Sequence, residues 1–162
     1  MDIVRVTTEQ ADDIAPLVAD FRSALRRYKG IEKGSDIPAG RSELLAFLQS
    51  GYPIWAARCA GQYIGYVVCR IDDGTLWVEH LYVAETWRRK GVASRLFAQA
   101  EDMSCALGSD TVFNFVHPNN DGMFAFLRAK GYTVLNLVEI RKPYAGETLR
   151  TKIQVGEHSF DY

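Results

Sequence analysis

The sequence lacks the features of membrane, secreted and general nucleic-acid-binding proteins. No apolar run is long enough to cross a bilayer, and residues 1–20 carry Asp2, Glu9, Asp12 and Asp13 where a signal peptide would be apolar. The 19 basic and 20 acidic residues give a net charge of −1, which disfavours general affinity for nucleic acid. With 48% hydrophobic residues in 162 positions, we expect a single globular domain located in the cytoplasm.

Cysteine and histidine are also scarce. The three cysteines include no Cys-x-x-Cys pair, so they predict neither a disulfide framework nor a zinc site. The three histidines are scattered without metal-ligand spacing, and we therefore expect no metal. No nucleophilic serine or cysteine motif is present, which disfavours a covalent acyl-enzyme.

The hydrophobic periodicity predicts alternating strands and helices. Thr7 and Gln10 have the spacing of a capping box at the first helix, and Pro16 should kink that helix or mark a restart. The first expected helix ends near Tyr28, and the other expected helices span 42–49, 91–107 and 120–130. The expected strands span 3–7, 54–59, 63–71, 76–83, 111–116, 132–140, 153–155 and 159–162. This order predicts an α+β fold, an α/β/α sandwich around a mixed sheet.

The most informative segment is Arg88-Arg89-Lys90-Gly91-Val92-Ala93, which lies between an expected strand and an expected helix. Gly91 lets the backbone approach a ligand, and Ala93 leaves the next turn uncrowded. The free N–H groups and the dipole of a starting helix attract anions. The segment therefore predicts a diphosphate site, although alone it would also fit a solvated basic helix start. Its spacing is neither that of an ATP-binding loop nor that of a Rossmann loop.

This spacing, Arg-x-x-Gly-x-Ala, resembles the pyrophosphate loop with which the GNAT family of N-acetyltransferases holds acetyl-CoA. Asn120, followed by a short helix and Gly131-Tyr132, resembles a second motif of that family. The resemblance covers about residues 3–142 and implies one N-acetyltransferase domain over 1–162. It also implies a mostly antiparallel central sheet with a splayed strand pair. The tail 143–162 would be an added or exchanged strand, which is compatible with a homodimer.

The resemblance further implies how acetyl-CoA would bind. Strand 76–83 would splay from strand 111–116, with the pantetheine arm in the gap and the N–H near Leu81 stabilising an oxyanion. The diphosphate would reach the amides of 89–94. The residues implied in cofactor binding are Leu81, Tyr82, Val83, Arg88, Arg89, Lys90, Gly91, Val92, Ala93, Ser94, Asn120 and Phe124.

Glu79 is the candidate general base. An alkylamine has a pKa of about 10.4 and must lose a proton before its nitrogen attacks. Several relatives have a glutamate four residues before the equivalent of Val83, and strand alternation would place Glu79, Leu81 and Val83 on one face. Alternatively, Glu79 pairs with a basic side chain on the sheet. His80 is expected to be packed or hydrogen-bonded on the opposite face, and His117 is a second candidate, as base or acceptor-binding group.

One position departs from the family pattern: Leu127 stands where many members have a tyrosine that acts as general acid. The general acid is therefore unassigned. The leading hypothesis is transfer of acetyl from acetyl-CoA to a primary amine by direct attack in a ternary complex. The alternative is an acyl-CoA-binding sensor that does not turn over.

The acceptor would be a small-molecule or peptide amine. The family shapes its acceptor pocket with the loop between the first two helices and with the C-terminal strands. In this chain Glu32, Asp36 and Glu43 bring negative charge to that loop region, where basic residues are interspersed. A cationic amine would suit these carboxylates, but such a mixture also fits a solvated loop, so the acceptor stays open.

Overall fold

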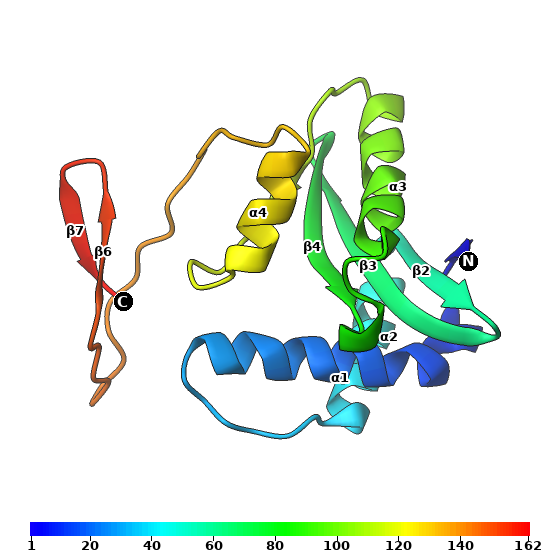
Figure 1. Ribbon diagram of the computed structural model, residues 1–162, viewed down its shortest axis with the longest axis horizontal. Helices are drawn as coiled ribbons and strands as arrows, with labels where there is room; N and C mark the ends of the chain where they lie inside the picture. The colour runs from blue at the N-terminus through cyan, green and yellow to red at the C-terminus, as the bar shows by residue number, and fades with distance from the viewer. The chain divides into compact units, whose positions relative to one another are not determined.

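The computed structural model describes residues 1–162, which form two compact units, residues 1–126 and 127–162. The first unit contains a five-stranded sheet in the order β1-β2-β3-β4-β5 (Figure 1). The β1–β2, β2–β3 and β3–β4 pairs are antiparallel and the β4–β5 pair is parallel, so the sheet is mixed and mostly antiparallel, as predicted. These strands are β1 Asp2–Arg5, β2 Ile54–Cys59, β3 Gln62–Asp72, β4 Thr75–Val83 and β5 Phe113–Asn114.

Helices cover both faces of this sheet. The ring of Tyr66 on β3 meets Phe21 of α1 (Ala11–Tyr28), with centroids 6.5 Å apart. A Cβ on the neighbouring Gly65 would instead lie 3.3 Å from Leu96 of α3 (Val92–Ala106). Because successive residues of a strand point to opposite faces, α1 and α3 lie on opposite sides of the sheet. The predicted α/β/α sandwich is therefore confirmed.

The start of α1 follows the predicted capping pattern. The Thr7 N–H donates to Gln10 Oε1 at 2.8 Å, and Thr7 Oγ1 accepts from the Glu9 N–H at 3.3 Å. This capping box holds a short 3-10 turn, Thr8–Gln10, immediately before α1. The helix then continues through Pro16 to Tyr28, so the restart considered for Pro16 does not occur.

The second helix, α2 (Ile37–Gln49), packs closely on α1 at Gly40. A Cβ there would lie 2.7 Å from the Ala15 carbonyl oxygen and 2.8 Å from the Ala19 nitrogen, both on the α1 backbone. Gly40→Ala should therefore lower the free energy of unfolding by about 1–3 kcal/mol, as overpacking typically does. Urea denaturation measures this loss.

The matched control is Gly34→Ala, because the space around a Cβ at Gly34 is open. This variant should unfold at nearly the wild-type midpoint. Equal midpoints for Gly40→Ala and the wild type would contradict the close approach of α1 and α2.

Two expected strands differ from the structure. Strand 111–116 is reduced to the two residues of β5, and 132–140 forms no strand, so the latter prediction was wrong. The apolar side chains of this segment are exposed, with 87% exposure at Val134 and 74% at Leu137. Apolar alternation marks a segment able to pair, but it does not supply the neighbouring strand that must satisfy the backbone N–H and C=O groups.

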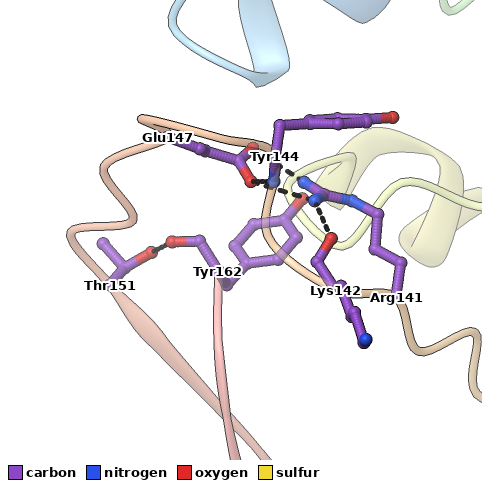
Figure 2. Close-up of polar contacts among 6 residues, drawn as sticks. All are labelled: Arg141, Lys142, Tyr144, Glu147, Thr151 and Tyr162. Atoms are coloured by element: carbon purple, nitrogen blue, oxygen red, sulfur yellow. Dashed lines mark hydrogen bonds and ion pairs between the residues drawn. The ribbon is translucent and has the colours of Figure 1, made fainter.

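The second unit contains a hairpin of β6 (Lys152–Val155) and β7 (His158–Asp161), which pair with each other as a separate two-stranded sheet. Figure 2 shows the contacts before and at the base of this hairpin. The guanidinium of Arg141 donates to both carboxylate oxygens of Glu147, at 2.8 and 2.9 Å, and Thr151 Oγ1 donates to the Tyr162 carbonyl. In the whole chain, no helix has both the length and the apolar character of a membrane span.

Candidate functional site

The turn between β4 and α3 leaves the start of α3 without a side-chain cap. After Val83 the chain makes a short 3-10 turn, Glu85–Trp87, and Gly91 then serves as the N-cap of α3 with no side chain to accept a hydrogen bond. The first helical bond runs from the Arg95 N–H to the Gly91 carbonyl at 3.1 Å. Because the first turn of a helix has no intrahelical partners for its N–H groups, these amides are available to an anion.

Left-handed backbone shapes this turn. Gly91 has φ +78°, and Arg89, two residues earlier, has φ +61°. Glycine adopts this region at little cost, whereas it strains a residue with a Cβ, and such strain clusters at ligand-binding sites. The turn thus exposes the N-terminal end of α3, the end of the helix dipole that favours negative charge.

The three basic residues before Gly91 have different surroundings. Arg88 Nε donates to the Val83 carbonyl at 3.1 Å, and its guanidinium lies 5.7 Å from the Tyr82 ring centroid. The Lys90 ammonium lies 4.9 Å from the ring centroid of Trp87. Arg89 is exposed. Arg88 therefore braces the loop against β4, and the three side chains do not form one uniform cluster.

The pairing between β4 and β5 is short, which is compatible with the splayed pair implied by the family resemblance. They pair only at Trp77 with Phe113 and at Val78 with Asn114. From residue 79 to Val83, β4 has no strand partner on the β5 side, although its other edge is paired with β3. An unpaired edge of this kind can bind an extended chain through its main-chain groups. The edge includes Leu81 and leads directly to the turn before α3.

A β-bulge places Glu79 differently from the prediction. His80 is opposite Val68 and Val78 is opposite Cys69, so Glu79 is an extra residue in β4. The expectation that Glu79 shares a face with Leu81 and Val83 was wrong, because the bulge interrupts the alternation of the strand.

The carboxylate of Glu79 is held by Arg70. Its Oε1 accepts from Arg70 Nε at 2.6 Å, and Arg70 also donates to Asp72 at 2.7 Å. Arg70 occupies the same face of β3 as Tyr66, the face that α1 covers. The alternative considered from the sequence, an ion pair between Glu79 and a basic side chain on the sheet, is therefore present.

His80 is buried, as expected, in a polar chain under α1 and α2. Its Nδ1 lies 3.1 Å from the Tyr66 hydroxyl, and its Nε2 lies 3.8 Å from Glu43 Oε1 on α2. Burial, helped by the positive charge of Arg22, lowers the pKa of His80 to about 3. Burial raises the pKa of Glu43, while Arg22 at 3.4 Å opposes this shift. No spacing in the sequence links Glu43 with His80, because the two residues lie 37 positions apart on different elements.

Acid should destabilise the protein through His80. Its folded-state pKa lies below the ordinary value of about 6.5, so unfolded chains bind a proton that folded chains do not. Stability should therefore fall by about 1.4 kcal/mol per pH unit due to this group as the pH drops below 6.5. Glu43 has the opposite sign, because its raised pKa favours proton uptake by the folded state, so its effect must be separated from that of His80 within the window below about pH 6.5.

Urea unfolding at several pH values checks this expectation against His80→Gln, which cannot take up the proton. The wild type should lose stability more steeply than the variant across the window. Parallel curves for the two proteins would show that His80 does not titrate as described.

The loop after β5 is attached to the end of α1. The ring of His117 stacks on Tyr28, with centroids 5.4 Å apart, and Asn119 Nδ2 donates to the Tyr28 carbonyl at 2.9 Å. Partial burial and the charge of Lys29 lower the pKa of His117. Asn120 Oδ1 accepts from the Met123 N–H at 3.1 Å at the start of α4 (Asp121–Ala129). Tyr28 thus positions His117, whereas Arg70 positions Glu79.

The three cysteines are free and differ in exposure. Cys69 is buried, and burial raises the pKa of its thiol to about 12, so this thiol does not ionise readily. Cys59 is half-buried and Cys105 is exposed. No group of three or more His, Cys, Asp or Glu side chains is arranged to hold a metal ion.

A sequence model of the acetyltransferase (GNAT) family matches residues 19–132. No curated protein matches the sequence. The fold is similar to that of aminoglycoside 6'-N-acetyltransferase AAC(6')-IG from Acinetobacter haemolyticus, with 19% identity, a TM-score of 0.65, and coverage of 89% of this chain and 99% of that one.

Two further structures have the same fold. AAC(6')-Iy, solved with the bisubstrate analogue CoA-S-monomethyl-acetylneamine, has 18% identity and a TM-score of 0.69, and the match covers 88% of this chain and 98% of that one. Ribosomal-protein-alanine N-acetyltransferase from Brucella melitensis biovar Abortus 2308 has 17% identity and a TM-score of 0.68, with coverage of 89% and 100%. At these identities the likeness concerns the fold.

Proposed function

Because this chain belongs to the GNAT family of acetyltransferases, we propose that it transfers an acetyl group from acetyl-CoA to a primary amine by direct attack in a ternary complex. The observation that carries the proposal is the uncapped start of α3, next to the unpaired edge of β4. The uncapped helix start suits the diphosphate of CoA, and the unpaired strand edge suits its extended pantetheine arm. A solved structure of similar fold, AAC(6')-Iy, holds a CoA-derived bisubstrate analogue, which supports this use of the fold.

In this proposal the amides of Val92, Ala93 and Ser94 bind the diphosphate, and Arg89 adds positive charge. Gly91 allows the close approach, and Arg88 keeps the loop on β4 through its bond to the Val83 carbonyl. The pantetheine amides would bind the edge of β4 from Leu81 to Val83, with the Leu81 N–H polarising the thioester carbonyl. Asn120 and Phe124 would lie near the CoA moiety.

The acceptor must lose a proton before it attacks. We propose that Glu79 accepts this proton, directly or through water, and that Arg70 fixes the carboxylate in position. The amine nitrogen then bonds to the thioester carbon, and the tetrahedral intermediate releases CoA as a thiolate. A CoA thiol should have a pKa near the value of about 8.5 for cysteine, so the thiolate is a tolerable leaving group. Leu127 cannot donate a proton to it. His117 is the second candidate for the base or for acceptor binding.

Two observations keep an acyl-CoA sensor as the second candidate function. Arg70 already neutralises the Glu79 carboxylate, and a leucine replaces the tyrosine that many family members use as general acid. A sensor would need the α3 start but neither of these groups.

Release of free CoA thiol from acetyl-CoA separates the two functions. Aminoglycosides, polyamines, amino acids and peptides with free N-termini should be screened as acceptors, with acetyl-CoA affinity measured by calorimetry. An enzyme releases thiol with at least one of these classes. Acetyl-CoA binding without thiol release for any amine would favour the sensor, and absence of binding would eliminate both.

A further inference from the structure

A cavity of about 410 Å³ lies between α1, α2 and the loop that joins them. This volume is in the range of small-molecule sites and exceeds the space of a few water molecules. Its lining is almost entirely charged, and consists of Arg22, Arg26, Lys33, Asp36, Ala39 and Glu43. We call this feature the α1–α2 cavity.

The loop wall of the α1–α2 cavity is tied to α1. Ser23 Oγ donates to the Lys33 carbonyl at 2.8 Å, and Ser35 Oγ donates to Asp20 Oδ1 at 2.5 Å. Arg26 also holds this wall, because its guanidinium donates to the Gly34 carbonyl at 3.2 Å. The cavity is thus built by specific contacts between the loop and the helix.

Two cations of the cavity have no ion pair, although Arg26 donates to the Gly34 carbonyl. Glu43 pairs with Arg22 at 3.4 Å, and Asp36 Oδ1 caps α2 by accepting from the Ala39 N–H at 3.0 Å. Neither Arg26 nor Lys33 has a carboxylate partner, since the other ion pairs of α1 and α2 are Arg27–Glu85 and Arg41–Asp12. In addition, Arg26 Nε is shielded from solvent and has no acceptor. The lining of the cavity has three cations (Arg22, Arg26 and Lys33) and two carboxylates (Asp36 and Glu43), so its net charge is +1.

The cavity also borders the strand on which the reaction is proposed. Glu43 on its wall lies 3.8 Å from the Nε2 of His80. His80 immediately precedes Leu81, the residue proposed to hold the thioester. The contact between Glu43 and the buried His80 thus connects the wall of the cavity with β4.

We propose that the α1–α2 cavity binds the acceptor by a carboxylate, through Arg26 and Lys33, so that the acceptor is an amine that also carries a carboxylate, such as an amino acid. A guanidinium is suited to this task, because its fork of N–H donors matches the two oxygens of a carboxylate. The inference rests on the proposed acetyl transfer and narrows its acceptor class. It disfavours polyamines, which bring only positive charge to a cavity with unpaired cations.

The test compares each standard amino acid with its own carboxamide, which keeps the amine and the side chain but removes the anionic charge. Thiol release gives kcat/KM for every pair, and calorimetry without acetyl-CoA measures binding directly. The best amino acid should exceed its carboxamide by at least about tenfold, the value of a charge-assisted hydrogen bond of about 1.5 kcal/mol. Arg26→Gln should abolish this ratio, and Arg26→Lys should retain part of it.

Lys33→Gln is a second test that remains valid if the Arg26 variants misfold, because Lys33 is exposed on the loop. This variant should also reduce the ratio of amino acid to carboxamide. Arg41→Gln is the matched control, since Arg41 pairs with Asp12 on the surface and does not line the cavity. Equal use of amino acids and carboxamides, or a ratio unchanged in Arg26→Gln, would overturn the proposal while leaving acetyl transfer intact. If no amine is acetylated, binding of amino acids that Arg26→Gln abolishes still supports the cavity, and absence of binding overturns it.

Discussion

Glu79→Gln should lower kcat by about two to four powers of ten, the usual contribution of general acid–base catalysis. The amide has nearly the shape of the carboxylate but cannot accept the proton of the amine. The affinity for acetyl-CoA should change by no more than about twofold, because the cofactor is proposed to bind the main chain of β4 and not this side chain. Thiol release measures the first effect and calorimetric titration the second.

Asp72→Asn is the matched control for this prediction. Asp72 accepts from the same guanidinium as Glu79, at 2.7 Å, but lies near the end of β3 and is exposed. The Asp72→Asn variant should keep kcat within about threefold of the wild-type value, because it retains Glu79, the group proposed to accept the proton. Unchanged turnover in Glu79→Gln would remove Glu79 as the base and leave His117 as the remaining candidate.

The double variant Arg88→Ala, Arg89→Ala should weaken acetyl-CoA binding by about 100-fold at low salt. Hydrogen bonds to charged groups contribute about 1.5–3 kcal/mol, and about 2.7 kcal/mol corresponds to this factor. The two residues act differently: Arg89 adds charge at the anion site, whereas Arg88 braces the loop against the Val83 carbonyl. Calorimetry across a salt series should show that the loss shrinks as ionic strength rises, because salt screens exposed charges.

Arg58→Ala, which removes an exposed cation on β2, controls for net charge. It should bind acetyl-CoA with wild-type affinity at every salt concentration. A double variant that keeps full affinity at low salt would mean that the basic residues before Gly91 do not serve the diphosphate.

Local patterns predicted much of this fold because their physical causes are local. The capping box at Thr7 and Gln10 depends on side chains three positions apart, and the structure contains it. The helix expected after Gly91 is present as α3, and the strand expected at 54–59 is β2, since period and turn residues define both. The short pairing between β4 and β5 is compatible with the splay that the family resemblance implied, and the pattern within one strand cannot indicate where its pairing with a neighbour ends.

Non-local contacts account for what the sequence did not reveal. Glu79 is displaced by a bulge, and a bulge depends on the register between β3 and β4, which alternation within one strand cannot report. The segment 132–140 has the pattern of a strand but no partner in the structure. Arg26 and Glu43 come together across two helices to line one cavity, although no spacing in the sequence links them.

The proposed function requires the backbone at the start of α3 to bind the diphosphate of CoA. An amide NMR titration of the full chain with CoA tests it most directly, because it observes these N–H groups one by one. The account predicts large shifts for Gly91, Val92, Ala93 and Ser94 at saturation, and unchanged signals for the hairpin of β6 and β7. Unmoved signals from Gly91 to Ser94 at millimolar CoA would contradict it.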